Sequence, residues 1–294
     1  MTRVAVIGLG NMGLPMAVNA VKAGHDVTGH DLAPAALEAA SAAGVTVRAS
    51  GPEAVRAAEM VITMLPAGRH VLEAYDELLP AAPAGTLFVD CSTIDVTAAR
   101  AAHARAAGAG HRSVDAPVSG GVVGAEAATL TFMAGGEEAA LTAAEPVLAA
   151  LGKRTVRCGG PGAGQAAKIC NNMILGVSMI AVSEAFVLGE RLGLDHQALF
   201  DVASTASGQC WALTTNCPVP GPVPTSPANR DFQGGFAAQL MLKDLGLAMS
   251  AAYEHGVAAV LGQAAADRYA RFVETDDRVR DFSAIIEDIR GATG

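Results

Sequence analysis

The stretch RVAVIGLGNMG, residues 3–13, runs from a short apolar, β-forming segment directly into three glycines spaced G-x-G-x-x-G. Gly8 permits a tight turn, Gly10 lets a pyrophosphate approach the backbone, and Gly13 lets the following helix pack closely on the strand. The spacing alone is weak evidence, but here it lies between a predicted strand and a predicted helix at residues 12–23. The stretch therefore predicts the first βα unit of a dinucleotide-binding domain, with the phosphates at the helix N-terminus.

The alternation of strand and helix continues through the first half of the chain. Further strands are predicted at residues 25–30, 61–65 and 86–90, and alanine-rich helical stretches lie between them. Strands that alternate with helices favour parallel βαβ units with right-handed crossovers and helices that cover the sheet. We therefore predict an α/β fold in which residues 1–162 form a Rossmann-type, doubly wound sheet.

The second half of the chain has a different pattern, because no strand is predicted after residue 158. Residues 168–192 predict one long helix with apolar residues on nearly every face, which favours a buried helix over a membrane span. Further helices are predicted at residues 195–204, 237–255 and 261–274. We expect an all-α domain over residues 163–294, joined to the first domain by the long central helix.

A proline-rich segment interrupts the helical half. Residues 216–227, NCPVPGPVPTSP, hold five prolines and cannot be helical, because proline lacks the amide hydrogen and fixes φ. A segment of this length and irregularity is either a stiff surface linker or a loop that borders a substrate pocket or a subunit interface. The sequence leaves both interpretations open.

Composition and charge exclude several classes of protein. The chain has 294 residues, of which 51% are hydrophobic and 17% charged, as is typical of a globular protein with room for two domains. The net charge of −9, without a basic stripe, argues against a nucleic-acid partner. No CxxC pair occurs among the five cysteines, and the chain starts directly with a strand-like segment. We therefore expect reduced thiols, no metal site, no signal peptide and a cytoplasmic location.

An acidic residue follows the second predicted strand. Asp31 lies 18 residues after Gly13, where a carboxylate typically accepts the ribose hydroxyls of a dinucleotide. No Arg or Lys occurs between Leu32 and Ala42, so a 2′-phosphate would meet a carboxylate and no cation. The sequence therefore predicts NAD rather than NADP. Asp31 can at the same time cap the helix that begins near Ala33.

Further cofactor contacts are expected where the next strands end, since ligands of such sheets bind at the carboxyl ends of the strands. Leu65 ends the strand at residues 61–65 and Pro66 follows it, and Thr93 follows the strand at residues 86–90. The candidate cofactor residues at this stage are Gly8, Gly10, Asn11, Met12, Gly13, Asp31, Leu65, Pro66 and Thr93.

Two short polar motifs are compatible with more than one interpretation. Ser119, Gly120 and Gly121 offer a hydroxyl and two unobstructed amides, which suit a carboxylate or an oxyanion, and a plain turn explains them equally well. Lys243 and Asp244 lie on a predicted apolar helix and form either an exposed charged pair or part of a site.

A third polar motif opens the long central helix. Lys168 and Asn172 are four residues apart and share one face of the helix, and Asn171 lies close to that face. Such residues are costly to bury without partners. They form either a partly exposed polar helix end or, where two domains meet, a catalytic set.

Taken in order, these motifs resemble those of the β-hydroxyacid dehydrogenase family, and the resemblance covers nearly the whole chain. The matching segments are GLGNMGLPMAVNAVKAGH at 8–25, DAPVSGGVVGAEAATLTFMAGG at 115–136, GAGQAAKICNN at 162–172 and KDLGLA at 243–248. Residues 207–236 resemble the branch of the family that acts on 3-hydroxyisobutyrate. One departure is Ala127-Ala128-Thr129, where many relatives have a glycine before the threonine.

The resemblance implies an NAD-dependent dehydrogenase that oxidises 3-hydroxyisobutyrate to methylmalonate semialdehyde, a step of valine breakdown, in a cleft between the two domains. The alternatives within the family act on tartronate semialdehyde, glyoxylate or succinic semialdehyde. Relatives of the last two kinds typically carry Asn-Arg where this chain has His30-Asp31. The alternative outside the family's enzymes is a non-catalytic NAD-binding module, against which Lys168 and Asn172 argue. Homodimers or homotetramers built through the helical domain are implied, and no membrane partner is expected.

The resemblance also implies roles for individual residues. Lys168 is the catalytic residue that takes or relays the hydroxyl proton, and Asn172 orients the substrate. Lys243 lies near the nicotinamide ring of the cofactor. The substrate-binding residues implied are Ser119, Gly120 and Gly121 at the carboxylate, with Asn171, Trp211, Phe232 and Asp244 around the rest of the substrate.

Overall fold

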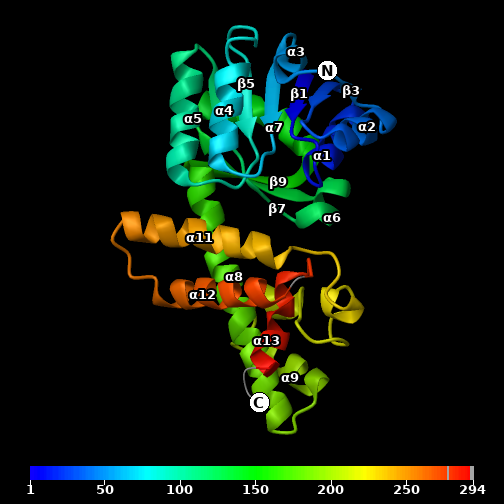
Figure 1. Cartoon of the computed structure of the whole chain (residues 1–294), viewed down its shortest axis with the longest axis vertical. Helices are drawn as coiled ribbons and strands as arrows, with labels where there is room; N and C mark the ends of the chain where they lie inside the picture. The colour runs from blue at the N-terminus through cyan, green and yellow to red at the C-terminus, as the bar shows by residue number, and fades with distance from the viewer. Residues whose placement is uncertain (277, 292–294) are drawn as a thin grey trace. The chain divides into compact units, whose positions relative to one another are not determined.

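The computed structural model describes residues 1–276 and 278–291 (Figure 1). The chain divides into two compact units, the first comprising Met1–Lys168 and the second beginning at Ile169. The first unit is an α/β domain built around one sheet, as predicted. Its strands are β1 (Arg3–Ile7), β2 (Asp26–His30), β3 (Thr46–Val47), β4 (Met60–Thr63), β5 (Leu87–Asp90), β6 (Arg112–Asp115), β7 (Val118–Ser119), β8 (Leu130–Gly136) and β9 (Gly152–Gly159).

The strand order is β3-β2-β1-β4-β5-β6-β8-β7, and β9 pairs with β8. All pairs from β3 to β6 are parallel, and this is the order of a doubly wound dinucleotide-binding sheet. Beyond β6 the sheet changes direction, because β8 is antiparallel to both β6 and β7 and parallel to β9. This extension was not predicted in detail from the sequence.

The helices of the first unit lie on both faces of the sheet (Figure 1). Along β1, Val4 and Val6 pack with helices on one face, whereas Ala5 and Ile7 pack with helices on the other. This period of two buries both faces and explains why the strands are continuously apolar. One face is covered by α1 (Gly13–Lys22), α2 (Pro34–Ala42), α6 (Gly121–Glu126) and α7 (Glu138–Leu151), the other by α3 (Gly51–Val55), α4 (Gly68–Leu78) and α5 (Val96–Gly108).

The second unit is helical, and no strand follows β9 in the part of the chain that the structure describes. The long helix α8 begins within the first unit and continues into the second, and α11 and α12 lie side by side (Figure 1). The elements are α8 (Ala163–Arg191), α9 (His196–Ala203), α10 (Trp211–Thr214), η1 (Pro227–Arg230), α11 (Ala238–Glu254), α12 (Val260–Thr275), η2 (Phe282–Ala284) and α13 (Ile285–Gly291).

Helix α8 is less buried than its composition predicts. By length and composition alone it could cross a membrane, but core helices of soluble proteins meet the same criterion. Of its most apolar 18-residue stretch, 44% is buried. The expectation of burial on nearly every face was wrong for Ile174 and Leu188, whose side chains are 64% and 60% exposed. The surrounding helices of the second unit cover only part of the α8 surface, which composition cannot reveal.

The proline-rich segment is irregular, as predicted, but it is not a surface linker. Cys217, Val219 and Val223 are buried in the core of the second unit. The Ser226 hydroxyl donates a hydrogen bond of 2.6 Å to the carbonyl of Cys217. The interpretation as a stiff surface linker was therefore wrong, and a border with a pocket or a subunit interface stays a prediction.

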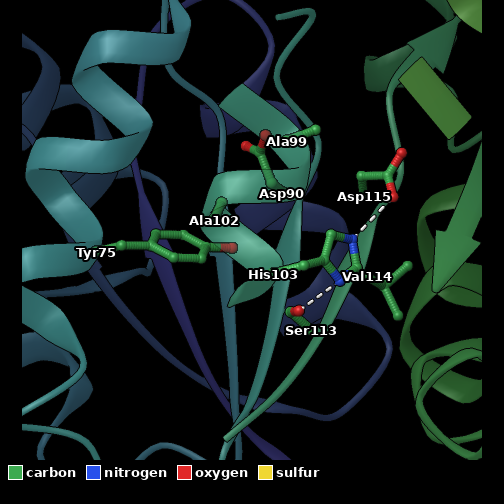
Figure 2. Close-up of a pocket in the computed structure, with 8 residues that line it drawn as sticks. All are labelled: Tyr75, Asp90, Ala99, Ala102, His103, Ser113, Val114 and Asp115. Atoms are coloured by element: carbon green, nitrogen blue, oxygen red, sulfur yellow. Dashed lines mark hydrogen bonds and ion pairs between the residues drawn. The ribbon is translucent and has the colours of Figure 1, made fainter. Parts of the chain in front are cut away.

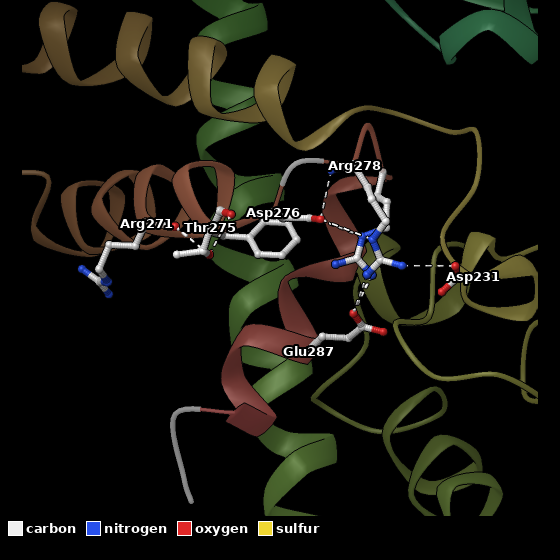
Figure 3. A network of polar contacts seen from close by, with 8 residues as sticks. Asp231, Arg271, Thr275, Asp276, Arg278 and Glu287 are labelled. Atoms are coloured by element: carbon white, nitrogen blue, oxygen red, sulfur yellow. Dashed lines mark hydrogen bonds and ion pairs between the residues drawn. The ribbon is translucent and has the colours of Figure 1, made fainter.

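Ion pairs connect the segment that follows the prolines to helix α13 (Figure 3). Arg278 pairs with Asp231 at 3.3 Å, with Asp276 at 3.4 Å and with Glu287 at 3.5 Å. Arg280 is only 3% exposed and pairs with Asp276 at 2.7 Å and Glu287 at 2.5 Å. The half-exposed Arg278 contributes little to stability, whereas removing a partner of buried Arg280 would leave a charge uncompensated.

The departure at Ala128 has a structural consequence at the end of α6. Ala128 has a φ of 53°, in the left-handed region that favours glycine. The Thr129 amide donates to the Gly124 carbonyl at 2.8 Å and the Ala128 amide to the Ala125 carbonyl at 3.4 Å. These are the two hydrogen bonds of a Schellman motif, in which glycine usually occupies the position of Ala128.

We expect Ala128→Gly to raise the free energy of unfolding by roughly 0.5–1 kcal/mol, because glycine adopts this backbone conformation without a Cβ penalty. Urea denaturation measures the change. Ala127→Gly is the matched control, since Ala127 has a φ of −82° and glycine there should lower stability. A destabilised Ala128→Gly variant would contradict the strain assigned to this residue.

Candidate active site

The glycine-rich turn after β1 has the shape that a bound pyrophosphate requires. Gly8 has a φ of +93°, and a Cβ on it would lie 2.3 Å from the carbonyl oxygen of Met64. A Cβ on Gly13 would lie 1.9 Å from the carbonyl oxygen of Gly8. A Cβ on Gly10, in contrast, would meet nothing within 4 Å. Gly8 and Gly13 are therefore needed for packing, and Gly10 leaves its backbone open, so the turn fits a dinucleotide at the start of α1.

Asp31 lies at the end of β2 and is held by two backbone amides. Its Oδ2 accepts a hydrogen bond from Leu9 at 2.7 Å, and its Oδ1 accepts one from Ala33 at 2.8 Å. The first contact fixes the carboxylate against the glycine-rich turn, and the second orders the turn that precedes α2. Each carboxylate oxygen has a further lone pair, so the geometry is compatible with the predicted ribose contact.

A buried carboxylate joins the ends of β4 and β5. Asp90 Oδ1 accepts hydrogen bonds from the hydroxyls of Thr63 at 2.7 Å and Ser92 at 2.6 Å. The Ser92 oxygen in turn accepts the Leu65 amide at 2.8 Å. Asp90 therefore orders the two loops that contain the predicted cofactor residues Leu65, Pro66 and Thr93.

Burial raises the pKa of Asp90 to about 6, against the hydrogen bonds from Ser92 and Thr63 that favour the charged form. Asp90 Oδ2 is buried and accepts no hydrogen bond. The carboxylate is thus only half satisfied, which makes its ionisation costly within the fold.

The first turn of α8 is fixed to the sheet by two side chains. Asp115, buried at the end of β6, accepts hydrogen bonds from the backbone amides of Gly162 at 2.8 Å and Gln165 at 2.9 Å. The Gln165 side chain donates to the Ser92 carbonyl at 2.7 Å and accepts from the Ile94 amide at 3.1 Å. The helix start is therefore linked to both β6 and the cofactor loop after β5.

Close backbone packing explains the glycines that precede Lys168. A Cβ on Gly164 would lie 2.2 Å from the carbonyl oxygen of Met133 and 2.6 Å from that of Asp115. Gly162 has a φ of +82°, which a larger residue rarely adopts. The motif GAG at 162–164 thus brings α8 directly onto β8.

The polar motif at the start of α8 is largely buried. Lys168 is 7% exposed and Asn172 is 1% exposed, and the two lie one turn apart on the helix. The interpretation as a partly exposed helix end was therefore wrong for these two residues, although Asn171 is exposed. The Asn171 amide donates to Asn172 Oδ1 at 3.0 Å.

A buried carboxylate on α11 orients Asn172. The Asn172 amide donates to Asp244 Oδ2 at 2.5 Å, and Asp244 is 2% exposed. Lys243 Nζ lies 3.4 Å from Asp244 Oδ1. The interpretation as an ordinary exposed pair was wrong for Asp244. The cluster combines an oriented amide, a carboxylate and an ammonium group, and the carboxylate contacts both of the other two groups.

The loop at residues 119–121 lies between β7 and α6. Gly120 has a φ of +135° and Gly121 a φ of +61°, so both need glycine for their backbone conformation. A Cβ on Gly120 would also lie 3.2 Å from a methyl group of Leu130. This conformation is compatible both with a plain turn and with an anion site, so the contact of Ser119, Gly120 and Gly121 with a substrate carboxylate stays a prediction.

Trp211 and Phe232 lie in different environments of the second unit. Trp211 begins α10 and is 53% exposed, whereas Phe232 is 5% exposed within the core. The Arg280 guanidinium stands 5.8 Å from the centroid of the Phe232 ring. Their roles as walls of a substrate pocket stay predictions.

Sequence reasoning did not select Asp90, Gln165 or His103, although each makes buried or nearly buried polar contacts. A weak signal existed for His103, which interrupts the alanine-rich α5. Among residues 1–276 and 278–291, no three His, Cys, Asp or Glu side chains lie together as metal ligands would.

Two family models match the chain. One describes the NAD-binding domain of 6-phosphogluconate dehydrogenase and matches residues 3–160. The other describes the NAD-binding of NADP-dependent 3-hydroxyisobutyrate dehydrogenase and matches residues 162–289. The two matches together extend over both units of the chain.

Full-length relatives are also similar. A probable 3-hydroxyisobutyrate dehydrogenase of Mycobacterium tuberculosis is 57% identical, covering 99% of this chain and 98% of the relative. An NAD-dependent L-serine dehydrogenase of Pseudomonas aeruginosa is 45% identical, covering 97% of each chain. A solved structure of the Mycobacterium tuberculosis 3-hydroxyisobutyrate dehydrogenase with L-serine has a TM-score of 0.96 at 57% identity, covering 99% of both chains.

We expect the stability of Asp90→Asn relative to the unchanged protein to rise with pH. Because the folded pKa of Asp90 is raised from 3.8 to about 6, the protonated form stabilises the fold at low pH, and this contribution is lost as pH rises through 6. Asparagine carries no charge, so the variant should gain on the order of 3 kcal/mol in relative stability between pH 4 and pH 7.5.

Chemical denaturation at a series of pH values measures this difference. Asp26→Asn, which alters an exposed carboxylate on β2, is the control and should show no such gain. A stability difference for Asp90→Asn that does not change with pH would show that its burial carries no such cost.

Proposed function

The chain belongs to the 3-hydroxyisobutyrate dehydrogenase family, and we propose that its reaction is the oxidation of 3-hydroxyisobutyrate to methylmalonate semialdehyde. It is an NAD-dependent dehydrogenase. The observation that supports the proposed chemistry is a buried lysine, Lys168, one helical turn before Asn172, whose amide is oriented by Asp244. A role in valine breakdown is part of the proposal.

Lys168 is the residue to which we assign the hydroxyl proton of the substrate. When bound, NAD accepts the hydride that leaves the carbon bearing the hydroxyl group. The proton of that hydroxyl passes to the neutral amine of Lys168 and from there to solvent, so that a carbonyl group forms as the C–H and O–H bonds break. Proton transfer of this kind contributes about 10²–10⁴-fold to the rate.

The other polar residues orient the substrate in this proposal. Asn172, held by Asp244, directs its amide toward the substrate, and Asn171 extends the same polar surface. Ser119, Gly120 and Gly121 supply hydrogen-bond donors for the substrate carboxylate. Lys243, whose ammonium group pairs with Asp244, lies near the nicotinamide ring of the cofactor in this proposal.

The cofactor residues follow the same logic. The turn from Gly8 to Gly13 takes the pyrophosphate, with Asn11 and Met12 at the start of α1, and Asp31 takes the ribose hydroxyls. The loops with Leu65, Pro66 and Thr93, ordered by Asp90, border the rest of the dinucleotide.

L-serine is a second candidate substrate. One relative is named for the NAD-dependent dehydrogenation of L-serine, and a solved relative carries L-serine. L-serine and 3-hydroxyisobutyrate share a primary alcohol and a carboxylate and differ at the carbon between them, which bears an ammonium group in one and a methyl group in the other.

A homodimer or homotetramer in the cytoplasm completes the proposal. Ile174, Val260 and Leu261 expose 64%, 72% and 69% of their surface in the second unit, and a second copy of the chain would cover such apolar side chains.

We expect kcat/KM with NAD to be at least about 10-fold higher for 3-hydroxyisobutyrate than for L-serine, since a methyl group gains from burial while an ammonium group must be desolvated. The measurement is steady-state NADH formation with 3-hydroxyisobutyrate, L-serine, 3-hydroxypropionate, glycerate and 4-hydroxybutyrate. NAD and NADP are compared side by side. A preference for L-serine would select the second candidate, and no turnover of any 3-hydroxy acid would exclude the proposed function.

We expect Lys168→Met to lower kcat by about 10²–10⁴-fold while NAD still binds, because methionine keeps the packing volume but has no amine. Stopped-flow turnover and a separate NAD titration measure the two effects. Lys153→Met, an exposed lysine in β9, is the control and should leave kcat unchanged. Near-normal turnover of Lys168→Met would remove the lysine from the mechanism.

A further inference from the structure

His103, on α5, contacts the carboxylate that anchors the start of α8 (Figure 2). Its Nε2 lies 2.9 Å from Asp115 Oδ1, and its Nδ1 lies 2.6 Å from the Ser113 hydroxyl. The His103 side chain is 10% exposed and that of Asp115 2% exposed.

Ser113, His103 and Asp115 have the residue types of a nucleophile, a base and an acid, but they are not placed to act as such. The cavity beside them leaves no room even for a water molecule. Both oxygens of Asp115 already accept backbone amides from the start of α8. The three residues therefore have no access to a substrate. They are connected instead, through Asp115, to the start of α8.

The contacts of Asp115 explain what His103 does. Asp115 Oδ1 accepts both the Gly162 amide and His103 Nε2, and Oδ2 accepts the Gln165 amide. A buried carboxylate that accepts three hydrogen bonds is fixed in orientation. Its negative charge also interacts favourably with the positive end of the helix dipole at the N-terminus. Without the donor from His103, Asp115 keeps only the Gly162 and Gln165 amides, so its carboxylate is less firmly oriented and the first turn of α8 can shift.

The position of the helix start matters for the proposed catalytic amine. Lys168 is three residues beyond Gln165, within the next turn of α8. Gln165 and the close approach of Gly164 to β8 hold the helix folded when one contact is lost. Loss of the His103 contact therefore changes the placement of Lys168 Nζ more than the stability of the unit.

We infer that His103 is a positioning residue, which acts through Asp115 on the first turn of α8 and sets the position of Lys168 Nζ. This inference rests on the function proposed for Lys168. It assigns a role in the reaction to a side chain that the sequence motifs do not include.

Two substitutions separate the contacts of His103. His103→Gln places an amide nitrogen near the position of Nε2 and keeps the donor to Asp115. His103→Asn places one near the position of Nδ1, keeps the contact with Ser113 and loses the donor to Asp115. We expect kcat to fall about 10-fold or more in His103→Asn and to stay within about 3-fold of the unchanged enzyme in His103→Gln, because misplacement of a catalytic group by about 1 Å can cost 10²-fold.

The loss should appear in kcat and not in KM, because His103 contacts neither substrate nor cofactor in the proposed site. Ser113→Ala is the control, since it leaves the donor to Asp115 in place, and should keep near-normal kcat. His103→Met has no donor at all and repeats the test if His103→Asn does not fold, with the same loss of kcat expected.

Hydrogen exchange provides a readout that does not depend on turnover. The backbone amides of Gly162 and Gln165 donate to Asp115, so their exchange should accelerate in His103→Asn and stay near normal in His103→Gln.

If the unchanged enzyme is active and the two His103 variants have equal kcat, the positioning role is wrong and the proposed function stands. If the unchanged enzyme oxidises no 3-hydroxy acid, the proposed function fails, and with it the positioning of Lys168 for that reaction. Equal exchange rates at Gly162 and Gln165 in both variants would overturn the link between His103 and the helix.

Discussion

The rest of the site depends on the hydrogen bonds that the Asp115 carboxylate accepts from the start of α8. This carboxylate is buried at the end of β6 and accepts the amides of Gly162 and Gln165. A buried charge is tolerated only while its hydrogen bonds are made, so the helix start cannot leave the sheet without a large cost. Because α8 continues from this point, the same contact fixes the backbone position of Lys168. The helix then continues to Asn172.

The buried polar groups around this anchor are linked to one another by short chains of hydrogen bonds. Asp90 holds Ser92, and Ser92 accepts the amide of Leu65, while its carbonyl accepts Gln165. In the second unit, Asp244 holds Asn172. Each chain joins a strand end or a helix face to a residue with a proposed role. Buried polar groups therefore occur, inside an otherwise apolar core, next to the residues to which ligand contacts are assigned in the proposal.

The sequence predicted the features that depend on neighbours along the chain. The strand before Gly8, the helix after Gly13 and the long helix α8 follow from local apolar periodicity and glycine spacing. The roles of Gln165 and Asp90 could not be predicted, because their partners are remote in sequence, as with Gln165 and the carbonyl of Ser92 at a separation of 73 residues. Composition also could not show which stripe of α8 is covered by other helices. The exposure of Ile174 was therefore not predicted.

The substrate is harder to derive than the reaction, for a chemical reason. In the proposed reaction Lys168 acts on an alcohol and the loop at residues 119–121 binds a carboxylate, and both 3-hydroxyisobutyrate and L-serine have these two groups. Selectivity must come from whatever surrounds the carbon between them, where an ammonium group needs an acceptor and a methyl group needs an apolar wall. Family motifs preserve the shared chemistry, so relatives that are 57% and 45% identical to this chain can bear the names of different substrates while keeping one fold.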